Sequence, residues 1–387
     1  MKILFLAPRF PYPPIQGDRL RAFYLLRLLS TRHTITLASP GELDAVAQAQ
    51  LPVVCERWVS LGKRGLPSFG MALHGITSSV PLQTLMFSPA TARERLGQLL
   101  NTAHYDAVHV HTARMGLAAE SLSIPGTLDY IDALSLNMLR RAEYEQPPIR
   151  LFLRIEGKRM QRYEQVLAQQ YKHLLVTSPD DYRALGGHKN LQIVPNGVDT
   201  KHFFYSETGR DECTIVLSGR MAYFPNADAA QFAALQILPL LRKHIPKAKL
   251  RIVGADPPAA VQALAGQPGV EVTGYVADVG AELRRATVAL APLRTGTGIQ
   301  NKLLEAMASG TPVVTTAHAL RGLQAQPDQH LLVGNSAQEL AQQLEKLLHD
   351  QALRIALART ARHLIEQSYT WEVAANLVEK AWQAGFH

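Results

Sequence analysis

Short apolar runs alternate with amphipathic stretches from one end of the chain to the other. The runs have the length of buried strands, and the stretches between them have the period of helices. Strands that alternate with helices form parallel sheets, with the helices packed against the sheet faces. The pattern therefore predicts an α/β fold built on doubly wound parallel sheets.

The length of the chain, 387 residues, favours two such domains. Proline, asparagine and glycine interrupt regular structure at residues 194–199, and a new series of strands and helices follows. We expect an N-terminal domain over residues 1–190, a C-terminal domain over residues 191–365, and a final helix over residues 366–387 that crosses back to the first domain. Such domains would enclose a cleft at the carboxyl ends of both sheets, where open α/β sheets bind ligands.

The apolar runs and the amphipathic stretches give the expected elements. The expected strands lie at 2–7, 34–39, 107–111, 126–131 and 174–177 in the first domain, and at 214–218, 249–253, 270–273, 288–291, 312–315 and 331–333 in the second. The expected helices lie at 18–30, 89–101 and 149–171, and then at 226–244, 257–265, 278–285, 300–308 and 337–348.

Composition limits the class of protein. With 47% hydrophobic and 19% charged residues the chain is globular rather than disordered. Cys55 and Cys213 have no metal-like spacing, and so low a cysteine content is typical of the reducing cytoplasm. The first apolar run ends at Pro8 and Arg9, which favours a strand over a signal peptide. No apolar run reaches the roughly 18 residues of a membrane span. We expect a cytoplasmic protein.

The positive charge is concentrated in the first half of the chain. Residues 1–190 contain 22 lysines and arginines against 15 acidic residues, whereas residues 191–387 contain 18 against 17. A basic domain favours an anionic partner. The basic residues are not interleaved with aromatic residues as in a nucleic-acid reader, so we expect no nucleic acid. An anionic membrane surface, contacted peripherally at its inner face, or an anionic acceptor fits better.

The most specific segment is residues 291–314, APLRTGTGIQNKLLEAMASGTPVV. A buried strand leads into a loop with Gly296 and Gly298, and a helix begins near residue 300. The free N–H groups at a helix start attract anions, and the glycines permit close approach to the backbone. Lys302 in the first turn is unfavourable for the helix unless an anion lies nearby. Glu305, one turn further, is placed to accept hydrogen bonds from a ribose diol.

This segment resembles the donor-site signature of retaining glycosyltransferases of the GT-B fold, family 4 (glycosyl transferases group 1). In that family a pair of spaced glutamates runs into the sequence Leu-Glu-Ala-Met-Ala-x-Gly-x-Pro-Val-Val, which residues 304–314 match. The resemblance implies that Glu305 holds the ribose, and Thr297 stands in place of the first glutamate. The longer segment is similar to sugar transferases encoded with bacterial exopolysaccharide and exosortase systems.

Other segments resemble the same family in the same order. Residues 194–199 resemble its interdomain element. Arg220, after Ser218 and Gly219, resembles the strand-end arginine that meets the diphosphate, and a planar guanidinium suits phosphate. The segment Gly274-Tyr275-Val276 resembles the family's turn that borders the base, which would place Val276 beside the base. The family has a lysine five or six residues after the arginine; those positions hold Pro225 and Asn226 here, so we expect Lys302 to supply that charge.

The remaining residues assigned to the donor site lie in loops. Gly298, Ile299 and Asn301 belong to the loop and first turn of the signature segment. Gly17 follows the first strand and resembles the family's glycine loop beneath the donor phosphates, although a plain strand–helix turn would have the same sequence. The resemblance therefore implies a nucleotide-diphosphate sugar, UDP-linked, as co-substrate.

Two regions at strand ends of the first domain are candidates for catalysis. His109 and His111 lie on one face of a strand, so His111 is expected to reach the cleft; both could equally be packed histidines. Asp129 and Asp132 stand where related enzymes carry a histidine near the reacting sugar. Asp132 would assist the acceptor hydroxyl or, alternatively, cap a helix.

No metal and no other cofactor is expected. The two histidines lack an apparent third ligand, and the Asp-x-Asp string of the other large glycosyltransferase fold is absent from the sequence. Positioning and stabilisation of the departing diphosphate would then do most of the catalytic work.

Basic residues recur between residues 140 and 162, in a stretch expected to run through one long helix, where they form a solvated helix face or contact lipid phosphates. We expect a retaining glycosyltransferase that passes a sugar to a glycan or a lipid-linked acceptor in surface polysaccharide or glycolipid synthesis. A UDP-sugar 2-epimerase of the same fold and a non-catalytic nucleotide-sugar-binding protein remain as alternatives. A Rossmann dehydrogenase is disfavoured because no strand precedes a Gly-x-Gly-x-x-Gly sequence.

Overall fold

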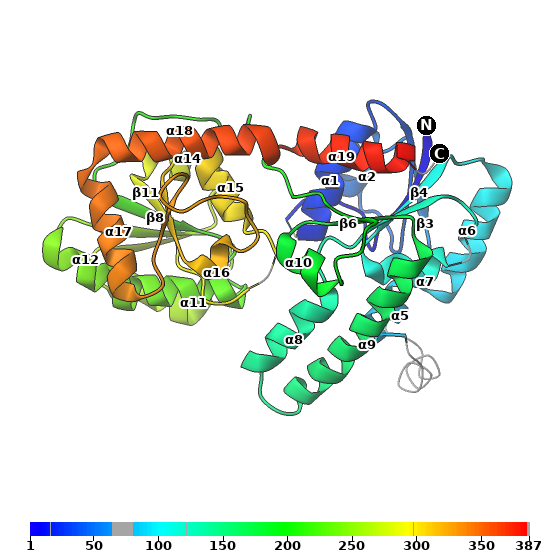
Figure 1. Ribbon diagram of the computed structural model, residues 1–387, viewed down its shortest axis with the longest axis horizontal. Coiled ribbons are helices and arrows are strands. Elements are labelled where there is room, and N and C mark those ends of the chain that lie inside the picture. Colours follow the sequence, from blue (N-terminus) through cyan, green and yellow to red (C-terminus); the bar gives the residue numbers. More distant parts are fainter. Residues whose placement is uncertain (16, 64–79, 121, 297, 385–387) are drawn as a thin grey trace. The chain divides into compact units, whose positions relative to one another are not determined.

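The computed structural model describes residues 1–15, 17–63, 80–120, 122–296 and 298–384 (Figure 1). The chain forms two compact units, Met1–Pro195 with Trp371–His387, and Asn196–Thr370. Each unit contains a parallel sheet with helices, so the expected α/β architecture of two Rossmann-like domains is confirmed.

The first unit has a seven-stranded sheet in the order β3-β2-β1-β4-β5-β6-β7. All neighbouring strands are parallel. The strands are β1 Lys2–Leu6, β2 Thr34–Ser39, β3 Arg57–Ser60, β4 Ala107–His111, β5 Gly126–Asp129, β6 His173–Val176 and β7 Leu191–Ile193. Strand order reverses between β1 and β4, and such a switch point is where doubly wound sheets bind ligands.

Helices cover both faces of this sheet (Figure 1). Ile3 and Phe5 of β1 pack on the side of α1 and α19, whereas Leu4 and Leu6 pack on the other side, so the run is apolar at every position. The helices are α1 Gly17–Leu29, α2 Ala45–Ala49, α3 Leu51–Val54, α5 Leu82–Phe87, α6 Ala90–Thr102, α7 Gly116–Ala119, α8 Leu134–Tyr144, α9 Ile149–Gln170, α10 Pro179–Ala184 and the C-terminal α19 Trp371–Ala384.

The second unit has a six-stranded parallel sheet in the order β10-β9-β8-β11-β12-β13. Its switch point lies between β8 and β11. The strands are β8 Thr214–Ser218, β9 Lys249–Val253, β10 Val270–Gly274, β11 Val288–Ala291, β12 Val313–Thr315 and β13 Leu332–Val333. The helices are α11 Phe224–Phe232, α12 Leu238–His244, α13 Ala259–Gln262, α14 Val279–Arg285, α15 Asn301–Ala308, α16 Ala317–Leu320, α17 Ala337–His349 and α18 Gln351–Ser368.

The elements differ from expectation mainly in the first unit. Strands β3 and β7 were not expected, and both are short edge strands. The basic stretch was expected to run through one long helix, but it is divided between α8 and α9, which pack against each other and project from the unit (Figure 1). In the second unit a π-helical turn at Ala233–Ile237 interrupts the expected helix 226–244. Within the described residues no helix is long and apolar enough to span a bilayer.

Candidate functional site

The switch point of the second unit carries two glycine-containing loops. One follows β8 and contains Gly219, at φ +147°; the other follows β11 and contains Gly296 and Gly298, at φ +113° and +69°. Few L-residues adopt these conformations. A Cβ atom at Gly219 would also lie 2.7 Å from the side-chain nitrogen of Asn226. Glycine at residue 219 therefore lets the loop close around Asn226.

Asn226 joins the segments that the sequence assigned to the diphosphate. Its side chain is buried, and its Nδ2 donates to the Arg220 carbonyl oxygen at 2.8 Å. The Lys302 ammonium donates to Asn226 Oδ1. Sequence analysis did not assign a role to Asn226. The only signal was its position, where the resemblance led us to expect a lysine.

The guanidinium of Arg220 lies at the surface of the second unit. Its Nε donates to the Asp256 carboxylate at 2.9 Å, and the two side chains are 51% and 58% exposed. Such an exposed ion pair is weak. It therefore leaves the guanidinium accessible to an anionic ligand.

Lys302 and Glu305 lie in the first turns of α15 and are partly exposed. Burial of the charged group lowers the pKa of Lys302 to about 8 and raises the pKa of Glu305 to about 7, and each charge partly opposes the shift of the other. Among the described residues, no ion pair joins them and no hydrogen bond reaches the Glu305 carboxylate. Lys302 and Glu305 therefore do not form an ion pair with each other in the described structure. The carboxylate is positioned to accept hydrogen bonds from a ligand.

Contacts within the second unit fix the loop between β11 and α15. Arg294 forms a two-pronged ion pair with Asp228 and lies 4.6 Å over the ring of Phe232. His318 Nε2 lies 3.0 Å from the Gly296 carbonyl oxygen. These contacts anchor the loop at Arg294 and Gly296.

The other residues assigned to the donor site surround these contacts. Gly298 and Ile299 lie so close to Gly322 that a Cβ there would be 2.8 Å from the Gly298 oxygen. Asn301 Oδ1 is buried and has no hydrogen-bond partner in the part of the chain that the structure describes. Val276 follows β10, two strands from β8 along the same edge. The position of Thr297 lies outside the described residues.

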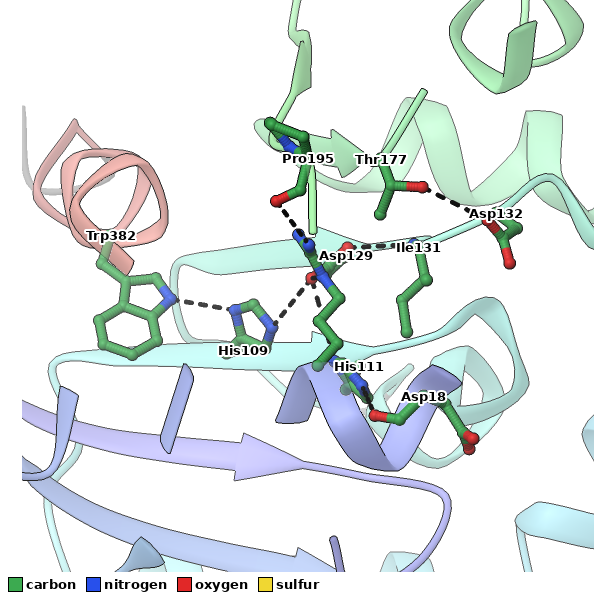
Figure 2. A network of polar contacts seen from close by, with 10 residues as sticks. Asp18, His109, His111, Asp129, Ile131, Asp132, Thr177, Pro195 and Trp382 are labelled. Atoms are coloured by element: carbon green, nitrogen blue, oxygen red, sulfur yellow. Dashed lines mark hydrogen bonds and ion pairs between the residues drawn. The ribbon is translucent and has the colours of Figure 1, made fainter. Parts of the chain in front are cut away.

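The switch point of the first unit contains a buried cluster around Asp129 (Figure 2). The carboxylate pairs with Arg21 Nε at 2.7 Å, and both side chains are 0% exposed. Arg21 also donates to the Pro195 carbonyl oxygen at 3.4 Å. His109 accepts from Trp382 Nε1 at 3.1 Å, and His111 Nε2 lies 3.0 Å from the Asp18 carbonyl oxygen. The cluster thus joins α1, β4, β5, α19 and the end of β7.

The histidines share one strand face, as expected, but that face is buried. Burial lowers the pKa of His109 to about 3 and also lowers the pKa of His111, which favours the neutral form of each ring. Sequence analysis found no third metal ligand beside them; the structure corrects this, because Asp129 brings three possible ligand atoms within 4.8 Å of one another. The Arg21 guanidinium already neutralises that carboxylate, which gives the cluster a structural explanation.

Asp132 lies just beyond β5 and is partly exposed. Burial of its carboxyl group and the nearby Asp181 raise its pKa to about 7. It does not cap α8: the N-cap residue is Ala133, and the Ser135 N–H in the first turn donates to the Glu164 carboxylate at 3.2 Å. The preceding Ile131 has φ +65°, a strained conformation for a β-branched residue. Strain of this kind often marks functional positions.

Gly17 is the first residue of α1, at the same edge of the sheet. A Cβ atom added there would meet no atom within 4 Å. The surroundings of Gly17 in the first unit are therefore open. Nearby, Arg9 pairs with Asp18 at 3.0 Å, and Arg114 interacts electrostatically with Asp18 and Asp132.

Comparison with known proteins finds a family match within the second unit. Residues 212–350 match the family described as glycosyl transferases group 1. No curated protein matches the chain.

Solved structures of similar fold cover the whole chain. Sucrose-phosphate synthase from Thermosynechococcus elongatus has a TM-score of 0.73 at 17% identity, over 100% of this chain and 99% of its own. Anabaena HepE in complex with UDP has a TM-score of 0.69 at 16% identity, over 99% and 100%. WaaG, a glycosyltransferase involved in lipopolysaccharide biosynthesis, has a TM-score of 0.63 at 17% identity, over 99% of each chain. The chain thus has the GT-B fold of two Rossmann-like domains, and residues 212–350 of its second domain match the model of the glycosyl transferases group 1 family.

Proposed function

We propose that the protein is a glycosyltransferase that moves a sugar from a UDP-linked donor to a hydroxyl acceptor with retention. The observation that carries the proposal is the group formed by Arg220, Asn226, Lys302 and Glu305 at the switch point of the second unit. It combines two cations for a diphosphate with an unbonded carboxylate for a ribose diol. Similar structures hold UDP and UDP-glucose, in complexes of Anabaena HepE, which favours uridine as the base.

The cations would stabilise the departing diphosphate. As the bond from the anomeric carbon to the diphosphate oxygen breaks, negative charge grows on that oxygen, and Arg220 and Lys302 would offset it. The acceptor oxygen then bonds to the anomeric carbon, and its proton passes to the released diphosphate. This chemistry requires no protein nucleophile and no metal, and we propose that the enzyme uses neither.

The first unit would supply the acceptor side. Asp132 is proposed to hold the sugar or the acceptor hydroxyl, since it is partly exposed at the edge of the sheet that also carries Gly17. His111 is 1% exposed and bound to the Asp18 carbonyl, so we assign it a positioning role at the start of α1 rather than contact with the substrate. The acceptor is proposed to be a glycan or a lipid-linked saccharide, reached from the cytoplasmic face of an anionic membrane.

A donor panel tests this function. The purified protein is mixed with UDP-, GDP- and dTDP-sugars and its melting temperature is measured; a ligand at 100 times its Kd adds about 2.7 kcal/mol of stability. We expect stabilisation by a UDP-sugar, and release of UDP that depends on an acceptor. Turnover of the UDP-sugar without acceptor would instead indicate an epimerase. Binding without any turnover would indicate a non-catalytic protein, and the absence of any stabilisation would contradict the proposed donor site.

A further inference from the structure

The hairpin of α8 and α9 exposes apolar side chains that its own packing does not use. Of the 14 large hydrophobic side chains exposed among the described residues, five gather at its tip and are between 49% and 62% exposed. These side chains, here called the apolar tip, are Tyr144, Ile149, Leu151, Phe152 and Ile155. Isolated exposed hydrophobic residues are ordinary, but a cluster of this kind marks an interaction surface.

The apolar tip is separate from the face by which α9 packs on α8. That buried face contains Leu153, Gly157, Met160 and Leu167, with Leu139 of α8 against Gly157. At 100° per residue, Leu151 and Ile155 lie on the side of α9 opposite that buried face, and Phe152 lies on the flank, about 100° from its centre. The helix therefore has a second apolar face, which the first unit leaves uncovered.

A row of basic residues lies beside the apolar tip. Arg150, Arg154, Lys158 and Arg162 are spaced every fourth residue, so they form one stripe along α9. Arg154, Lys158 and Arg162 are exposed, and none makes an ion pair with any residue that the structure describes. Residues 140–162 contain seven basic side chains against three acidic ones. The stripe therefore attracts an anionic surface.

The base of the hairpin is fixed to the sheet edge that carries Asp132. Ser135 at the start of α8 donates from its hydroxyl to the Glu164 carboxylate at 2.5 Å, and the Tyr130 hydroxyl donates to the Glu164 carbonyl oxygen at 2.7 Å. The Ala133 N–H donates to Asp181 at 3.0 Å. A ligand that holds the tip would consequently fix the orientation of this edge as well.

We infer that the hairpin is a membrane-docking element, whose apolar tip inserts into the interface of an anionic bilayer while the basic stripe contacts lipid phosphates. An apolar face beside a lysine- and arginine-rich face is the pattern of helices that lie in the bilayer interface. The two faces bind by different forces, since insertion resists salt whereas the attraction of the stripe is screened. The inference deepens the peripheral contact named in the proposed function, because it names the segment, but it does not depend on the donor site.

The test uses the full chain and vesicles of phosphatidylcholine, with or without phosphatidylglycerol. Each basic residue near an anionic surface contributes about a factor of five in binding, so replacing Arg154, Lys158 and Arg162 with Gln should weaken binding to anionic vesicles by about 100-fold. The matched control replaces Arg57, Lys172 and Lys189 with Gln; these exposed residues of the same unit carry the same charge, and their loss should change binding by only a few-fold.

The apolar tip is tested separately. Replacing Leu151, Phe152 and Ile155 with Ser should weaken binding at least about 10-fold, including at high salt, because buried apolar area is lost. In the Phe152→Trp variant, the fluorescence of the introduced tryptophan should be quenched by lipids that are brominated in their acyl chains. In the Val46→Trp variant, where the substituted residue is also exposed, the fluorescence of the introduced tryptophan should not be quenched.

UDP binding, measured by calorimetry, separates this inference from the proposed function and should be unchanged in every hairpin variant. Normal UDP binding with no vesicle binding would overturn the membrane inference alone and leave the apolar tip for a protein partner. The inference would also be overturned if the Arg154, Lys158, Arg162 variant and its control lost vesicle binding equally. Tryptophan fluorescence that brominated lipids fail to quench in the Phe152→Trp variant would overturn it as well.

Discussion

Asn226 is the residue through which the candidate donor site is assembled. Arg220, Lys302 and Glu305 were predictable from the sequence, because their chemistry and their motif both point to a nucleotide diphosphate. The contact of Lys302 with Asn226 was not predictable, because it joins residues 76 positions apart. The sequence shows that the loop carries Arg220 and the helix carries Lys302, but it does not show that the Asn226 amide lies between them.

We predict that the donor-site side chains bind UDP. Arg220→Ala and Lys302→Ala should each weaken binding by about 1.5–3 kcal/mol, the contribution of a hydrogen bond to a charged group. Glu305→Gln should also weaken it, because the neutral amide is a poorer acceptor for a diol. If Arg220 and Lys302 bind the same phosphates, the double variant should lose less binding free energy than the two single variants lose together. Calorimetry with UDP on folded variants measures each effect.

Arg285→Ala is the matched control for Arg220→Ala. Arg285 pairs with Asp211 at 3.1 Å, and its side chain is 56% exposed, close to the exposure of Arg220. Its loss should leave UDP affinity unchanged. If the Arg220, Lys302 and Glu305 variants all bound UDP as tightly as this control, the donor-site assignment would be wrong.

At the scale of elements, apolar runs predicted the central strands of both sheets well and the edge strands of the first sheet poorly. Strands β4 and β8 coincide with their expected bounds because both faces of each are buried. β3 is only partly buried and β7 has three residues, so neither gives a strong apolar signal. The hairpin was missed as a hairpin because α8 looks like an extension of the basic helix, although Pro147 and Pro148 separate the two helices.

The element that closes the first unit, α19, is attached to β4 by the Trp382–His109 hydrogen bond, and we predict a pH-dependent stability from it. The pKa of His109 is lowered from 6.5 to about 3, so in this range the unfolded chain binds a proton that the folded protein does not. The contribution of neutral, buried His109 to the free energy of unfolding is complete above about pH 6.5 and is lost as pH falls toward 3. Between pH 7 and 5 the wild type should lose about 1–2 kcal/mol more unfolding free energy than His109→Gln.

Urea unfolding at several pH values measures this difference. Glutamine at residue 109 can still accept a hydrogen bond from Trp382 but does not titrate. The variant therefore separates the effect of protonating residue 109 from the effect of losing the hydrogen bond. His104→Gln is the control, because the His104 side chain is 90% exposed and should not alter the pH slope. Parallel pH slopes for the wild type and His109→Gln would show that the folded protein protonates His109 as readily as the unfolded chain.

For the whole molecule, sequence pattern predicted two parallel-sheet domains, and the resemblance of one motif predicted the family model that residues 212–350 match. The first domain gave a weaker signal, because its candidate groups act through contacts between distant segments. Asp129 was considered for a role near the reacting sugar, yet it lies 0% exposed against Arg21, 108 residues away. In a sequence, a buried aspartate cannot be distinguished from an exposed one. Only the fold shows that Asp129 is buried and that it is paired with Arg21.

The balance of charge in the molecule leads to the last prediction, that transfer does not require a divalent metal. In the proposed donor site Arg220 and Lys302 would supply positive charge where a diphosphate loses its sugar, and Arg21 pairs with the buried Asp129. Activity should therefore be retained when EDTA is added to protein first dialysed against it, and the melting temperature should not change. The second measurement is needed because His109, His111 and Asp129 could hold an ion with a purely structural effect. Loss of activity that magnesium or manganese restores, with the melting temperature unchanged, would mean that a metal stabilises the leaving diphosphate. A fall in melting temperature would place the metal in the buried cluster instead.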